Sequence, residues 1–168
     1  MPHSVTQRVS TGNENVATDE KFVRYLYQLE DPSVPGVARY IGQSSSPARR
    51  LKRHRSAWTN TATLMAAWIR LLSSQDSFPI ASIIGSVSAP TERGAVFLAM
   101  REEERLVRSD LHRPNLLNHD AFYREMRING IDRKTSHEFI VAIADQRVEL
   151  ISCFMDRHPI LRKYGFLH

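Results

Sequence analysis

Arg39 to His54, with the sequence RYIGQSSSPARRLKRH, decides how this chain folds. The stretch begins as an extended segment that ends in Tyr40-Ile41-Gly42, continues through a polar turn, and opens a strongly basic helix at Pro47. Proline is tolerated in the first turn of a helix, and a glycine at the end of a strand favours a sharp turn or a close approach of the backbone. The pattern therefore predicts a strand followed directly by a helix, with Gly42 letting the chain turn between them.

Arg50 and His54 are four residues apart, so their side chains project from one face of the expected helix. Together with Tyr40 they bring a phenol, a guanidinium and an imidazole to one edge of a small sheet. This set suits the handling of a phosphate, because a guanidinium binds the anion and the other two groups accept or relay a proton.

Hydrophobic periodicity predicts the elements that surround this segment. Strands are expected at residues 23–29, 37–43 and 78–87, and helices at 47–57, 60–72, 91–111 and 135–155. Turn residues at 31–36 make the first two strands an antiparallel hairpin. We expect Asn60 to cap the second helix, and Thr135 with Glu138 to form a capping box for the last. The expected core positions of this last helix are Phe139, Ile140, Ile143, Val148, Ile151 and Phe154, with Leu161 and Phe166 packed behind it.

Composition limits the class of protein. A length of 168 residues predicts one domain, and a hydrophobic content of 42% is ample for a core. No apolar run reaches the ~20 residues that span a bilayer, and no signal peptide pattern opens the chain, so we expect a cytoplasmic protein. Residues 1–20 are polar and aperiodic and are expected to form a flexible tail. The single cysteine, Cys153, excludes an internal disulfide, and its apolar neighbours favour burial.

Positive charge is concentrated on the helix that follows Tyr40-Ile41-Gly42. The net charge is +5 and the sequence pI is near 9.7, which favours a polyanionic partner. Like charges without an acidic partner repel one another, so the cluster favours an anion-binding surface over a merely solvated helix face. We expect contacts to nucleic-acid phosphates from Arg49, Lys52, Arg53 and Arg55.

The spacing of these residues resembles the signature of the GIY-YIG nuclease family. In that family one strand carries Gly-Ile-Tyr and a second carries Tyr-Ile-Gly, and an arginine and often a histidine follow at fixed distances. Tyr40-Ile41-Gly42, Arg50 and His54 stand at those spacings. Tyr25-Leu26-Tyr27 takes the place of Gly-Ile-Tyr, so that Tyr27 keeps the tyrosine and Tyr25 replaces the glycine.

The resemblance covers about residues 22–118 and carries expectations about fold and function. It implies an α+β fold (α/β) at residues 21–120, with a three-stranded antiparallel sheet flanked by helices and a C-terminal helical extension at 121–168. It implies a metal-dependent DNA endonuclease that hydrolyses phosphodiester bonds. The cofactor would be one Mg²⁺ or Mn²⁺ held by Glu103 and waters.

The resemblance also implies roles for the other site residues. Tyr27 matches the general base that activates water, and Tyr40 matches its supporting phenol. Arg50 matches the residue that binds the scissile phosphate. His54 would tune the proton path by a hydrogen bond to a tyrosine or to the leaving oxygen. Asn118 matches an asparagine that supports the site through hydrogen bonds.

The position of Glu103 has a reason in the sequence itself. Helical spacing places it within an apolar stripe made of Val96, Ala99, Met100, Leu106 and Val107. A carboxylate among apolar side chains is costly unless it binds a cation or hydrogen-bond donors. The alternative is an ordinary surface glutamate, and Glu104 is the rival for the role of metal ligand.

Two other classes of function stay open. A nucleic-acid-binding module with a degenerate site is supported by Tyr25 in place of glycine. A transcription factor with a helix-turn-helix in the C-terminal region is suggested by Asn129-Gly130 between helical segments. A single metal site cuts one strand, so a double-strand break would need a homodimer or successive nicks. We expect the C-terminal extension to supply the dimer interface or further DNA contacts.

Overall fold

The computed structural model describes residues 21–56, 63–109 and 116–164. Its elements, in chain order, are β1 (Phe22–Glu30), β2 (Ala38–Ser44), α1 (Pro47–Ser56), α2 (Leu64–Ser74), β3 (Ile80–Ala89), α3 (Glu92–Arg108), α4 (His119–Ile128), α5 (Arg133–Ala144), α6 (Val148–Arg157) and a 3₁₀ helix, η2 (Pro159–Tyr164). The predicted α+β class, with a three-stranded antiparallel sheet and helices, is confirmed. Among these residues no helix is both long and apolar enough to pass through a membrane.

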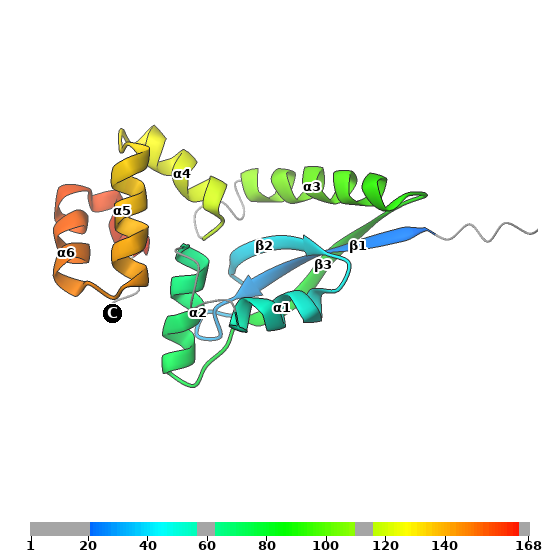
Figure 1. Ribbon diagram of the computed structural model, residues 1–168, viewed down its shortest axis with the longest axis horizontal. Helices are drawn as coiled ribbons and strands as arrows, with labels where there is room; N and C mark the ends of the chain where they lie inside the picture. The colour runs from blue at the N-terminus through cyan, green and yellow to red at the C-terminus, as the bar shows by residue number, and fades with distance from the viewer. Residues whose placement is uncertain (1–20, 57–62, 110–115, 165–168) are drawn as a thin grey trace, which may run out of the picture.

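The sheet has the strand order β2-β1-β3, with both neighbours antiparallel to β1. Tyr27 of β1 stands opposite Gly42 of β2, and a bulge interrupts the pairing of β1 with β3 after Leu26. Helix α3 packs across one face of the sheet, and α1 lies on the other side (Figure 1). Side chains alternate between the faces of a strand, so Tyr27 and Tyr40 face away from α3 while Ile41 packs toward it.

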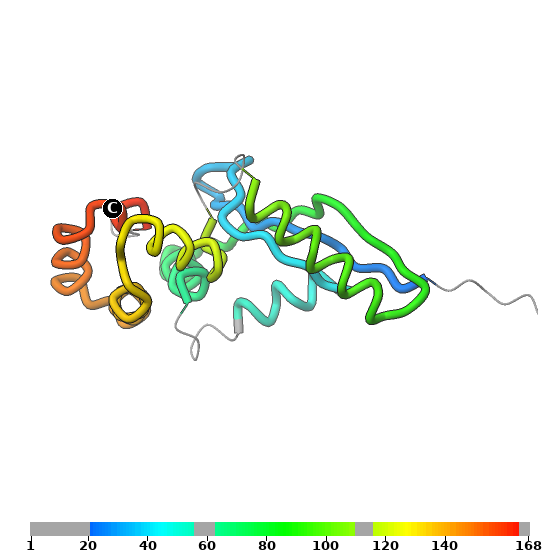
Figure 2. Tube along the Cα trace, turned by 90° about the horizontal axis from the view of Figure 1, so that it is seen from above, coloured from blue at the N-terminus to red at the C-terminus, as the bar shows by residue number. Residues whose placement is uncertain are grey.

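The larger hydrophobic cluster joins the sheet to the C-terminal helices. It contains Tyr27 and Leu29 of β1, Trp68 of α2, Phe122 of α4 and Phe139 of α5. Two views show α4, α5 and α6 grouped at one end of the molecule, beside α2 (Figures 1 and 2). The segment after residue 120 therefore shares its core with β1 and α2.

The C-terminal helices differ from the expected single helix at 135–155. The chain breaks between α5 and α6, where Gln146 has a φ of 55° in the left-handed region. Asp132 is the N-cap of α5, and its side chain accepts a hydrogen bond from the Thr135 amide, so the predicted capping box is wrong. Val148 is exposed rather than buried, whereas the other described core positions of this prediction are buried.

Other expectations about helix ends and burial also change. Thr63 caps α2, and its hydroxyl accepts a hydrogen bond from the Ala66 amide. Asn60, the tail at residues 1–20 and Phe166 lie outside the described residues. Cys153 is half-buried rather than fully buried.

Candidate active site

Gly42 makes room for two tyrosine rings. A Cβ atom at this position would lie 2.8 Å from both the Tyr27 hydroxyl oxygen and Cε1 of Tyr40. Cβ atoms do not approach other atoms so closely, and the two ring centroids are only 6.2 Å apart. The prediction that Gly42 serves a sharp turn is wrong, because β2 continues to Ser44 and Gly42 lies within it. Its lack of a side chain instead permits the close approach of the two phenols.

Helix α1 presents two side chains to these phenols. The hydroxyl oxygen of Tyr27 lies 3.1 Å from Nε2 of His54, and the His54 ring meets Tyr40 edge-on at 5.6 Å between centroids. Arg50, one turn earlier on α1, lowers the pKa of both phenols through its charge and a hydrogen bond. Tyr27, Tyr40, Arg50 and His54, which the sequence analysis singled out, therefore lie together.

Burial decides which of these groups are charged. It raises the pKa of Tyr27 and of Tyr40, and this outweighs the opposing effect of Arg50. Burial, with the positive charges of Arg50 and Arg53, lowers the pKa of His54 to about 4. At neutral pH both phenols are protonated and the imidazole is neutral. The contact between Tyr27 and His54 is therefore a hydrogen bond between two uncharged groups.

The remaining basic side chains of α1 are exposed. These residues are Arg49, Lys52, Arg53 and Arg55. The Arg55 guanidinium lies over the Phe78 ring, 4.6 Å from its centroid. The first turn of α1 contains no acidic residue, although the N-terminal end of a helix favours negative charge. Helix stability therefore does not account for the arginines at the start of α1.

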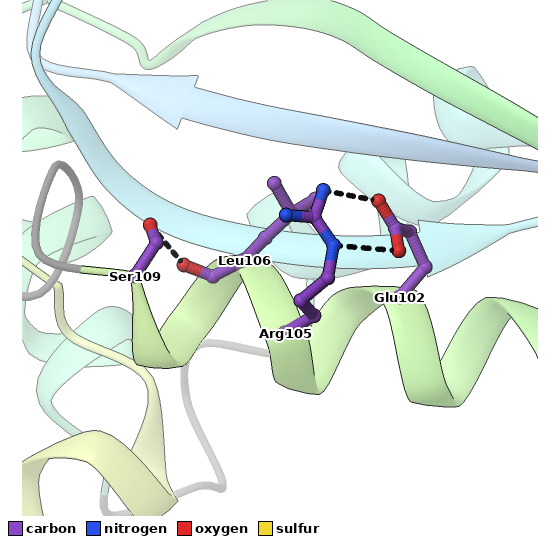
Figure 3. Close-up of polar contacts among 4 residues, drawn as sticks. All are labelled: Glu102, Arg105, Leu106 and Ser109. Atoms are coloured by element: carbon purple, nitrogen blue, oxygen red, sulfur yellow. Dashed lines mark hydrogen bonds and ion pairs between the residues drawn. The ribbon is translucent and has the colours of Figure 1, made fainter.

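Glu103 differs from the glutamates on either side of it. Glu102 accepts two hydrogen bonds from Arg105, at 2.9 Å from Nε and 2.5 Å from Nη2 (Figure 3). Glu104 forms an ion pair with Arg108. Among the described residues Glu103 has no such partner. The carboxylate of Glu103 is thus half-buried and available to a cation.

Glu103 lines a hollow of about 640 Å³, together with Tyr40 and Asn118. Burial raises the pKa of Glu103, the nearby Asp120 carboxylate raises it further, and Arg50 lowers it. Arg50 lowers the pKa of both phenols and also the pKa of Glu103. The phenols and the Glu103 carboxylate are therefore linked electrostatically through Arg50.

The predicted apolar stripe on α3 is only partly observed. Ala99 and Val107 are buried, whereas Met100 is 57% exposed and lines the hollow. Glu103 therefore lies at the border of the buried face.

The donor set around Glu103 fits a hard divalent cation with few protein ligands. No group of three or more histidine, cysteine or acidic side chains that could hold a metal occurs within the described ranges. Mg²⁺ retains several waters and commonly binds one or two carboxylates plus substrate phosphates. An unpaired carboxylate in an open hollow suits that mode of binding.

Asn118 acts on the backbone of β2. Its side-chain Nδ2 donates to the Ile41 carbonyl at 2.7 Å, and its Oδ1 accepts from the Ile41 amide at 3.0 Å. The amide of Leu117 donates to the Arg39 carbonyl, so this segment pairs with the outer edge of β2. Both polar ends of the Asn118 side chain are occupied. Asn118 thus holds Ile41, and with it the neighbouring Tyr40, in place.

Sequence reasoning missed several charged residues of the hollow. Asp120 lies in the first turn of α4, and the hollow is also lined by Arg101, Arg108 and Arg124. An Asn followed by an Asp before an amphipathic segment is a helix-start signal that was available at Asn118. Tyr25 is half-buried and stands opposite Ser44 of β2 and Ser86 of β3.

Comparisons of the chain with protein-family models, curated proteins and solved structures find no match.

Proposed function

We propose that this protein is a metal-dependent endonuclease that hydrolyses phosphodiester bonds in DNA at a GIY-YIG-type site. The observation that carries the proposal is the grouping of two phenols, Arg50 and His54 in electrostatic contact with the unpaired Glu103. Phosphodiester hydrolysis needs a positive group at the phosphate, a proton acceptor for water and a carboxylate for a cation. The grouping contains each of these.

Arg50 is the residue proposed to bind the scissile phosphate. A guanidinium binds phosphate through two parallel hydrogen bonds, and its charge stabilises the negative charge that grows in the transition state. Phosphate binding also offsets the positive charge of Arg50. Because that charge lowers the pKa of His54, we expect the imidazole to become a better proton acceptor when DNA is bound.

Tyr27 and His54 form the proposed route for the proton of the attacking water. Tyr27 is protonated at neutral pH, so it can accept a proton only if it gives up its own. The neutral imidazole of His54, 3.1 Å away, is placed to take it. In this step the water proton moves to the Tyr27 oxygen while the Tyr27 proton moves to Nε2 of His54. The water oxygen then bonds to phosphorus, and the bond between phosphorus and the leaving oxygen breaks. The leaving oxygen keeps the bonding electron pair and takes a proton from solvent water.

Glu103 is the residue proposed to hold Mg²⁺ or Mn²⁺. When bound, such an ion supplies positive charge beside the phosphate and leaving oxygens. Asp120 and Glu103 repel each other in its absence, and this raises the pKa of Glu103. A cation next to both carboxylates would relieve the repulsion.

The proposed partner is DNA, and the proposed compartment is the cytoplasm. The net charge of +5 and the exposed basic side chains along α1 support a phosphate backbone as the ligand. A homodimer through the C-terminal extension stays a prediction.

Incubation of the purified protein with supercoiled plasmid tests the proposal. With Mg²⁺ or Mn²⁺ we expect nicked circles, and with EDTA or in a Glu103→Ala protein we expect none. Arg50→Ala should lower the single-turnover rate more than it weakens binding. Arg53→Ala should mainly weaken binding and reduce the slope of log affinity against log salt by about one.

A non-catalytic nucleic-acid-binding module is the second candidate, favoured by the raised pKa of Tyr27, which makes the phenol a poorer base. DNA binding without nicking in either metal would establish that alternative.

A further inference from the structure

A second hollow, of about 410 Å³, adjoins the first. The two share Asp120 and Arg124 as lining residues, so they lie side by side along the start of α4. The second hollow is further lined by Tyr123, Arg127 and Arg133. It lies between α4 and α5, and its three further lining residues have no role in the proposed reaction.

The arginines of the second hollow are not explained by the stability of the fold. Within the described residues, the side chains of Arg124 and Arg127 form no hydrogen bond and no ion pair. Arg133 lies in the first turn of α5, where a positive charge is unfavourable and where no acidic residue stands. The Asp132 carboxylate at the same place is occupied, because it accepts hydrogen bonds from the amide and hydroxyl of Thr135.

Tyr123 is held in place at the same hollow. The His119 ring packs edge-on against it at 4.6 Å between centroids, and its hydroxyl lies 3.3 Å from Nδ1 of His137. The Arg133 guanidinium lies 5.3 Å from the Tyr123 ring centroid. A fixed aromatic ring beside unpaired arginines is the arrangement that proteins use to bind nucleic-acid strands, because bases stack on the ring while phosphates meet the cations.

We propose that the second hollow binds the DNA strand beyond the scissile phosphate. Arg127 and Arg133 would contact its phosphates, and Tyr123 would face a base or sugar. The inference rests on the proposed function, because the second hollow is next to the hollow of Glu103 and shares Asp120 and Arg124 with it. In this arrangement α4 and α5 lengthen the stretch of DNA that the protein contacts. The added contacts lie on one side of the scissile phosphate.

The test compares an Arg127→Ala/Arg133→Ala protein with the parent chain and with Arg157→Ala. Arg157 is an exposed arginine on α6 that lines neither hollow, so its substitution removes one positive charge away from the site, compared with two removed within the site by the double variant. Melting temperatures of all three proteins establish that they are folded. Binding of fluorescent DNA is measured by anisotropy at several salt concentrations, in the presence of Ca²⁺ or EDTA.

We expect the double variant to reduce the slope of log affinity against log salt by about two, one for each phosphate contact. The Arg157→Ala protein should show a smaller change. DNA duplexes shortened stepwise from one end are also compared. Removal of the base pairs that reach the second hollow should weaken binding by the parent chain and leave binding by the double variant unchanged. Equal slopes for the double variant and the control would overturn the inference, as would an effect of the two arginines on poly-glutamate binding alone.

The outcomes separate this inference from the proposed nuclease activity. A parent chain that binds DNA without cutting it would remove the activity, and the salt slopes would still decide the second hollow. A parent chain that cuts plasmid, combined with unchanged slopes in the double variant, would remove the second hollow alone.

Discussion

The hydroxyl oxygen of Tyr27 lies 3.1 Å from Nε2 of His54, and neither group is charged at neutral pH. A proton can therefore pass between them without separating two buried charges beforehand. If both act in one proton transfer, the loss of either should remove the function of the other.

We expect Tyr27→Phe and His54→Gln each to lower the single-turnover cleavage rate by roughly 10²–10⁴, the usual contribution of general acid-base catalysis. The double variant should be little slower than the slower single variant, because residues that act as a unit show non-additive losses. The rates are measured at saturating DNA. Losses that multiply in the double variant would mean that the two side chains act independently.

Glu103 and Glu104 are adjacent, yet we expect their substitutions to differ sharply. Glu103→Gln should lower cleavage roughly 100-fold or more, because cation stabilisation of the transition state is worth several kcal/mol. Glu104→Gln removes an exposed ion pair with Arg108, which contributes about 0–1 kcal/mol to stability. Cleavage is titrated with Mn²⁺ for both variants. A larger loss in Glu104→Gln would move the proposed metal ligand to that residue.

The pH dependence of cleavage should report the carboxylate of Glu103. The pKa of this group is raised, and a carboxylate binds a cation only when it is ionised, so activity should fall as the pH drops through the pKa of Glu103. Asp120→Asn removes a negative charge that raises this pKa, and should move the acidic limb to lower pH. Glu104→Gln is the control. If the acidic limb of the pH profile is unchanged in the Asp120→Asn protein, Glu103 is excluded as the titrating group.

Gly42→Ala should damage the site, whereas Gly85→Ala should not. The new methyl group at position 42 would lie 2.8 Å from the Tyr27 oxygen, but at position 85 it would meet Cδ1 of Leu26 at 3.6 Å, an ordinary contact. We expect Gly42→Ala to cost about 1–3 kcal/mol of unfolding free energy and most of the activity. Urea denaturation and plasmid nicking measure the two effects. Equal behaviour of both variants would show that the phenols tolerate displacement.

Asn118→Ala should destabilise the fold. The substitution leaves the amide and carbonyl of Ile41 without their side-chain partners, and an unsatisfied buried group costs about 1–3 kcal/mol. Asn129→Ala is a matched control, because Asn129 donates one exposed hydrogen bond to the Glu125 carbonyl. Urea unfolding of both variants gives the difference. A stability equal to that of the control would show that β2 does not depend on the two hydrogen bonds between Asn118 and Ile41.

The parts of the site that could be predicted from the sequence depend on local spacing. The relation of Tyr40 to Arg50 and His54 follows from one strand and the helix directly after it. For Glu103, helical spacing leaves an ordinary surface glutamate open as the alternative, and the resemblance to the GIY-YIG family favours a metal ligand. What separates it from Glu102 and Glu104 is the pairing of those two with Arg105 and Arg108, and this depends on side-chain conformations that spacing alone does not fix.

The parts that were missed depend on contacts between distant segments. The role of Gly42 follows from its register against Tyr27, which a reading of one strand does not reveal. The break after α5 is made by Gln146 in a left-handed conformation, where the usual glycine signal is missing. The hollow that Tyr40 shares with Asp120 and Arg124 brings together side chains from β2 and α4, and the Leu117 amide, just before α4, donates to the Arg39 carbonyl of β2.

Tyr27 belongs to the same hydrophobic cluster as Phe122 and Phe139. Because of this shared packing, we expect that the first half of the chain does not fold independently of the C-terminal helices. A chain cut after α3 would leave Leu29 and Trp68 facing water, and a foreign domain fused there would have to supply a matching apolar surface. Recombination, whether in evolution or in the laboratory, should therefore succeed only when β1, α2 and α4–α6 are inherited together.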